Sequence, residues 1–119
     1  MLTEDDKKNI LNHHLDNIWG ISNKDYQRRI WIHGEGPECG DFDETCNRFF
    51  PTIYDILENY KDFKIKENQY LILKKFTEEF AKFSDDNYHP ERFIDSPEWT
   101  QIMERAKEVL TTFNYQKKA

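Results

Sequence analysis

The stretch from Lys66 to Phe83, KENQYLILKKFTEEFAKF, carries the clearest signal for the fold class of this chain. Large apolar side chains recur in it every three or four residues, and Glu and Lys fill most positions between them. This spacing matches the period of an α-helix and predicts an amphipathic helix over residues 66–83. We expect the apolar stripe to be core, with an aromatic groove for a partner as the alternative. The stripe consists of Tyr70, Leu73, Phe76, Phe80 and Phe83.

The same period recurs on both sides of this stretch. Gly20 is typical of a helix C-terminus, and Ser96 followed by Pro97 is typical of a helix start. Pro51 lies within an apolar rhythm that begins at Phe42, and because proline removes a backbone donor we predict a break there. A strand over residues 29–32 is rejected because the chain offers no partner strand. Helices are predicted over residues 4–19, 23–33, 42–49, 51–61, 66–83 and 97–113, with a short turn at 91–94.

The predicted fold is therefore all-α, a compact bundle of five to six helices in a single domain, residues 1–119. Hydrophobic residues make up 37% and charged residues 34% of the chain, a balance that leans towards disorder. Nine Phe, six Tyr and three Trp oppose it, because aromatic side chains bury large areas from few positions. We expect a folded protein.

The net charge of −6 is confined to the first half of the chain. Residues 1–60 contain 6 Lys or Arg and 12 Asp or Glu, whereas residues 61–119 contain 11 of each class. A nucleic-acid-binding protein normally shows a basic patch, so we expect no nucleic-acid partner. An acidic surface instead favours a basic protein partner, whose association it accelerates.

The sequence also bears on location. No apolar run approaches the roughly 18–20 residues that span a bilayer, and residues 1–10 do not resemble a signal peptide. We therefore expect a cytoplasmic protein without membrane contact. Cys39 and Cys46 are then expected to be reduced, although their proximity permits a bridge.

The most polarised segment is the acidic stretch from Gly34 to Glu44, GEGPECGDFDE, which has three of the four glycines and no basic residue. Two of its acids, Asp41 and Glu44, have the spacing of a helix start. The others have no structural role in the sequence, and nearby Tyr and Trp side chains are of the types that anchor interfaces. A solvated loop with capping acids is the alternative. The predicted partner-binding residues are Glu35, Glu38, Asp41, Asp43, Glu44, Trp31 and Tyr26.

Catalytic and metal-binding patterns are weak. The acidic stretch lacks the order of an EF-hand, and it lacks the Lys and Ser or Thr of a phosphate-binding loop. No pair has the spacing of a zinc site, and no G-x-S-x-G motif is present. We predict no catalytic residue, metal or cofactor. A small enzyme or metal-binding protein using His33, Cys39, Cys46 or His89 remains an alternative, as does a subunit of a larger bacterial assembly.

Two resemblances add to this interpretation. The strings GPE at residues 36–38, DFDE at 41–44 and FIDSPEW at 93–99 resemble a group of small uncharacterised bacterial proteins over most of the chain. In size, acidity and helical content the chain is also similar to bacterial immunity proteins, which are cytosolic inhibitors that bind a toxin, often a basic nuclease. This second resemblance implies a non-catalytic protein that neutralises a basic toxin domain through an acidic surface.

Overall fold

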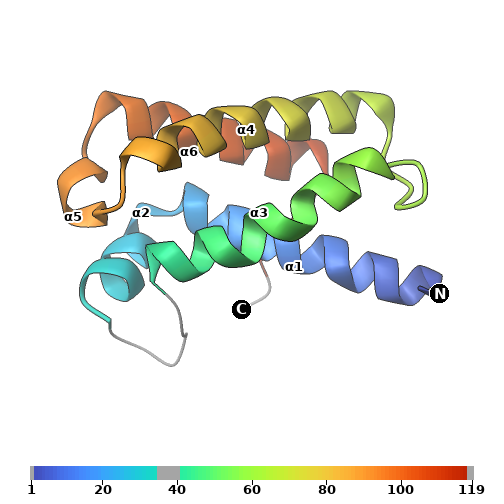
Figure 1. Ribbon diagram of the computed structural model, residues 1–119, viewed down its shortest axis with the longest axis horizontal. Helices are drawn as coiled ribbons and strands as arrows, with labels where there is room; N and C mark the ends of the chain where they lie inside the picture. The colour runs from blue at the N-terminus through green and yellow to red at the C-terminus, as the bar shows by residue number, and fades with distance from the viewer. Residues whose placement is uncertain (1, 35–40, 118–119) are drawn as a thin grey trace.

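The computed structural model describes residues 2–34 and 41–117, and all regular structure within these ranges is helical (Figure 1). The prediction of an all-α fold with five to six helices is confirmed. Six α-helices and one π-helical segment occur in the described part of the chain. Their bounds are α1 Glu4–Ser22, α2 Lys24–Tyr26, the π-helix η1 Gln27–Ile32, α3 Phe42–Glu58, α4 Glu67–Asp86, α5 Pro90–Phe93 and α6 Pro97–Thr112.

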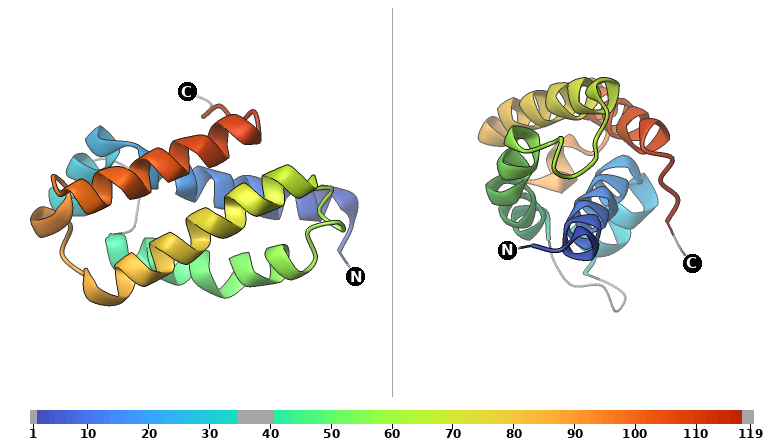
Figure 2. Two further views of the ribbon diagram at one scale, coloured as in Figure 1. Left: turned by 90° about the horizontal axis from the view of Figure 1, so that it is seen from above. Right: turned by 90° about the vertical axis from the view of Figure 1, so that its right-hand side faces the viewer.

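The four long helices form a ring around the core. Helix α1 packs against α3 and α6, and α4 packs against the same two helices (Figure 2). Successive long helices run in opposite directions, which is the up-down-up-down arrangement of a four-helix bundle (Figure 1). The short helices α2, η1 and α5 lie together at one end of the bundle.

The predicted helix starts are confirmed where polar side chains cap them. Thr3 and Asp6 form a reciprocal capping box at α1, with backbone-to-side-chain hydrogen bonds of 3.0 and 3.1 Å. The backbone N–H of Trp99 donates to Ser96 Oγ over 3.1 Å at the start of α6. These caps satisfy backbone donors that a helix start leaves unpaired.

Gly20 does not end α1, contrary to the prediction. The helix continues to Ser22, and Asn23 then starts α2 by accepting the Tyr26 N–H over 2.9 Å. A Cβ at position 20 would lie 3.0 Å from Tyr26 Cε1. The glycine therefore permits close packing of a tyrosine ring instead of terminating a helix.

The predicted break at Pro51 is also wrong, because α3 runs through it from Phe42 to Glu58. A proline inside a helix costs roughly 3 kcal/mol. Phe49, Ile53 and Ile56 are all buried by the continuous helix, and burying each such side chain contributes roughly 1.5–3 kcal/mol. Pro51 itself is exposed, so its ring needs no space in the core. Packing thus outweighs the local cost, and α3 ends at Glu58 instead of residue 61.

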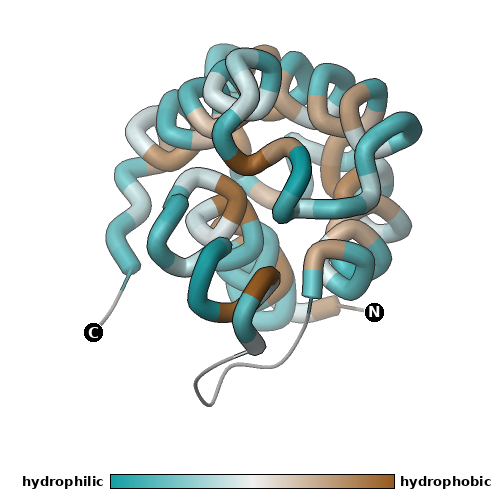
Figure 3. Tube along the Cα trace, turned by 90° about the vertical axis from the view of Figure 1, so that its left-hand side faces the viewer, coloured by the Kyte–Doolittle hydropathy of each residue, from teal (hydrophilic) through white to brown (hydrophobic). Residues whose placement is uncertain are grey.

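The buried hydrophobic residues form one core cluster to which all four long helices contribute. Figure 3 shows hydrophobic and hydrophilic stretches alternating along the helices, as expected when one side of each helix is buried. Three residues of the predicted stripe are core: Leu73, Phe76 and Phe80 are at most 1% exposed, whereas Tyr70 and Phe83 at its ends are half-buried.

Candidate functional site

The acidic stretch of the sequence reaches the start of α3. Glu35 and Glu38 lie outside the described residues. Asp41 is the N-cap of α3 and accepts the Glu44 N–H over 2.9 Å, while the Glu44 carboxylate pairs with Arg48 at 3.3 Å. Asp43 is exposed and has no ion pair with any described residue. Of the three described acids, Asp43 is thus the one without a structural role.

The two aromatic residues predicted beside this stretch are differently placed. Trp31 is only 7% exposed, and its ring packs 5.2 Å from the Phe42 ring and 5.9 Å from the Trp99 ring. Tyr26 is half-buried between Trp19 and Trp31. Trp31 is therefore a core residue, which corrects the expectation of an interface anchor, because a partner meets only exposed side chains.

The outer face of α3 carries more carboxylates than the sequence analysis assigned to the site. Asp55 and Glu58 are exposed roughly three to four turns after Glu44, and neither has an ion pair with any described residue. Arg48 is the basic residue within α3. We call this set the acidic face of α3; it consists of Asp41, Asp43, Glu44, Asp55 and Glu58.

An exposed aromatic residue adjoins the acidic face. Tyr54 is 48% exposed, and its ring stacks on that of Phe50 with 6.4 Å between centroids and 22° between planes. Sequence reasoning missed Tyr54, although it stands directly after Ile53 and therefore off the core stripe of the helix. Tyrosine in such a position is a common interface anchor, because it offers a large rigid surface and a polar tip.

A shallow groove of about 200 Å³ lies beside Tyr54, between α3 and α4. The residues that line it come from two different helices, so no local sequence motif predicts the groove. We call it the α3–α4 groove. It is lined by Tyr54, Leu57 and Glu58 of α3 and by Tyr70, Lys74, Thr77 and Glu78 of α4.

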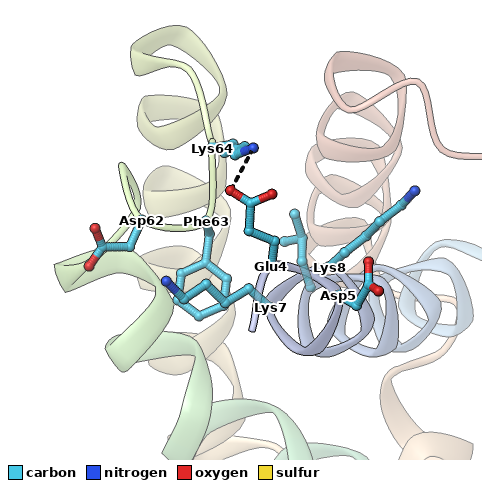
Figure 4. A pocket seen from close by; sticks show the side chains of 8 residues that line it. Glu4, Asp5, Lys7, Lys8, Asp62, Phe63 and Lys64 are labelled. Atoms are coloured by element: carbon cyan, nitrogen blue, oxygen red, sulfur yellow. Dashed lines mark ion pairs between the residues drawn. The ribbon is translucent and has the colours of Figure 1, made fainter. Parts of the chain in front are cut away.

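A second hollow, of about 280 Å³, lies between the start of α1 and the connection that follows α3 (Figure 4). Glu4 Oε1 and Lys64 Nζ form an ion pair of 3.1 Å across it, with both side chains largely exposed. Three acids and three lysines line this hollow, so it does not favour ligands of either charge. We therefore do not select it as the functional site.

The cysteine and histidine residues do not form a reactive cluster in the described part of the chain. Burial, together with the nearby Asp43 charge, raises the pKa of the Cys46 thiol to about 12. His33 and His89 are exposed, and Cys39 lies outside the described residues. Within residues 2–34 and 41–117 no three His, Cys, Asp or Glu side chains are placed to hold a metal ion.

The chain matches no protein-family model, no curated protein and no solved structure. None of the helices in the described ranges combines the length and the apolar character needed to cross a membrane.

Proposed function

We propose that this protein is a non-catalytic binding protein that neutralises a basic bacterial toxin domain in the cytoplasm, as an immunity protein does. The observation that carries the proposal is the acidic face of α3, where five carboxylates accompany one arginine and the last two, Asp55 and Glu58, are near the exposed Tyr54. This combination suits a protein surface rich in Lys and Arg.

The unpaired state of three of these carboxylates supports the proposal. Asp43, Asp55 and Glu58 have no ion pair among the described residues, so a partner's cations meet no competing base at them. Such a surface accelerates the encounter with a basic partner. Once water is excluded, close charge pairs across an interface contribute several kcal/mol in double-mutant cycles.

The residues of the alternative catalytic hypothesis also favour a binding role. The raised pKa of Cys46 makes its thiolate rare at neutral pH, and a nucleophilic cysteine requires a thiolate. The described residues offer no metal-binding cluster that would supply another route to hydrolysis. Binding to a partner uses only what the surface presents: charge, an aromatic ring and a shallow groove.

The test is a charge reversal on α3 compared with a matched reversal elsewhere. The variant Asp55→Lys/Glu58→Lys changes the outer face of α3, and Glu104→Lys/Glu108→Lys makes the same change in net charge on exposed positions of α6. Tagged proteins are expressed in the source organism, and the captured partner is identified, purified and tested for toxicity when produced alone.

We expect wild type and the α6 variant to bind a basic toxic protein with affinities that agree within about threefold, and the α3 variant to bind it at least about 100-fold more weakly. The affinity of the wild type should fall as salt rises, because exposed charges are screened. Equal binding by the α3 and α6 variants, or a captured partner that is neither basic nor toxic, would overturn the proposal.

A further inference from the structure

We infer that the α3–α4 groove receives an arginine side chain of the partner, with its stem against Tyr54 and Tyr70 and its guanidinium group at Glu58. This inference rests on the proposed function and names the chemical group that the partner presents. It is carried by the shape and lining of the groove and by which of its charges are already paired.

The walls and floor of the groove suit a flat, partly apolar group. The Tyr70 ring is fixed by stacking on Tyr60, with 4.2 Å between centroids and 21° between planes, and the Tyr54 ring is half exposed. Thr77 is fully buried at the base, and its hydroxyl already donates to the Leu73 carbonyl over 2.8 Å. Arginine stacks its planar guanidinium and its methylene stem on such aromatic faces.

The charged side chains around the groove favour one position for the partner's guanidinium group. Lys74 Nζ lies 3.9 Å from Glu78 Oε1, so the carboxylate of Glu78 is partly neutralised within α4. Glu58 has no ion pair with a described residue, and Asp55 lies one turn before it on the same helix. A guanidinium at Glu58 therefore gains charge-assisted hydrogen bonds without displacing an existing cation.

Other occupants fit less well. A second copy of this chain would bring its own acidic face, and the chain carries a net charge of −6, so like charges would meet. An uncharged apolar side chain would cover Glu58 and remove water from it without supplying a hydrogen bond, which costs free energy. The groove and the acidic face together therefore favour an arginine of a basic protein.

A short peptide isolates this contact from the rest of the interface. The backbone amide signals of the ¹⁵N-labelled protein are followed by NMR during titration with acetyl-Gly-Arg-Gly-amide, acetyl-Gly-Lys-Gly-amide and acetyl-Gly-Leu-Gly-amide. We expect the arginine peptide to shift the amides of Tyr54, Leu57 and Tyr70 most, the lysine peptide less, and the leucine peptide least, because only arginine combines a stacking plane with a forked donor.

Matched variants test the named residues. Glu58→Gln should lower the affinity for the arginine peptide by about fivefold. Asp55→Asn, one turn away on the same face, should change that affinity by less than about twofold. Tyr54→Ala should abolish the shifts, whereas Tyr88→Ala, at an exposed tyrosine beyond the end of α4, should not. Lys74→Glu should raise the affinity for the arginine peptide by more than Lys75→Glu does, because Lys75 does not line the groove.

Two results would overturn the inference. One is the absence of arginine-dependent shifts at the groove; the other is shifts that persist unchanged in Glu58→Gln and Tyr54→Ala. Either result leaves the proposed function standing if the Asp55→Lys/Glu58→Lys protein still loses its toxin. Conversely, a basic partner that loses affinity in Asp55→Lys/Glu58→Lys but is not toxic, together with a groove that binds the arginine peptide, would overturn the toxin-neutralising function and leave this inference standing.

Discussion

The indole Nε1 of Trp99 donates a hydrogen bond of 2.9 Å to Oε1 of Gln27, and both side chains are completely buried. The amide of Gln27 in turn donates to the carbonyls of Gly20 and Ile21, over 3.0 and 2.8 Å. One side chain of the π-helix η1 thereby joins the end of α1 to α6. A buried network of this kind is fully satisfied, so it fixes how the three elements meet.

The first prediction concerns this network. Gln27→Leu leaves the Trp99 N–H without its acceptor and removes a donor from the Ile21 carbonyl, whereas the Gly20 carbonyl still accepts the Asn23 N–H over 3.3 Å. Each buried polar group left unpaired costs roughly 1–3 kcal/mol. We expect a loss of about 2–4 kcal/mol in the free energy of unfolding, measured by urea titration with circular dichroism. Gln101→Leu, at an exposed glutamine of α6, is the control and should change stability by less than about 0.5 kcal/mol. Equal losses would contradict the role of Gln27.

A second prediction concerns the contact between Gly20 and Tyr26. Alanine at position 20 has a helix propensity better by about 1 kcal/mol, but its Cβ would lie 3.0 Å from the Tyr26 ring. Trp19 and Trp31 flank that ring, so it has little room to move. We expect Gly20→Ala to destabilise the wild type and to stabilise a Tyr26→Ala protein, as a double-mutant cycle of urea midpoints would show. A change in stability of the same sign in the wild type and in the Tyr26→Ala protein would refute the contact.

The third prediction is a dependence of stability on pH. Burial, with a smaller contribution from His13, lowers the pKa of His14 from 6.5 to about 4, and its Nε2 lies 2.7 Å from Thr52 Oγ1. Between pH 6.5 and 4 the imidazole of His14 is protonated in the unfolded chain but not in the folded protein. Stability is therefore lost as the pH falls through this window, by about 2 kcal/mol between pH 7 and pH 5.

Two variants separate this contribution from that of other groups. His14→Gln should remove most of the loss between pH 7 and pH 5, whereas His13→Gln, at the exposed neighbour, should retain it. Urea unfolding at the two pH values measures both. An identical pH dependence in the two variants would show that His14 is not the group that titrates.

The fourth prediction concerns the reactivity of Cys46. With a pKa raised to about 12, its thiol should react with iodoacetamide at pH 8 more slowly than an exposed thiol, whose pKa is about 8.5, by at least about 100-fold. The protein is prepared as Cys39→Ser so that one thiol is followed, and the rate is compared with that in 8 M urea. Fast alkylation of the folded protein would revive a catalytic role for this cysteine.

Local sequence patterns are enough to predict the helical class and most helix starts, because both depend on neighbours within one or two turns. The apolar period of residues 66–83 and the caps at Thr3, Asp41 and Ser96 are such local signals. The acid-rich start of α3 could be found in the same way, since charge is read directly from composition.

Where a local signal conflicts with long-range packing, the packing prevails. Gly20 and Pro51 carry strong signals for helix ends, yet packing of Tyr26 and of the core side of α3 keeps both within helices. Burial removes Trp31 from the surface, whereas Tyr54 is left exposed beside Glu58 at a groove built from two helices. The physical reason is that burial depends on which segments meet in space, and that information is spread over the whole chain instead of residing in any one stretch.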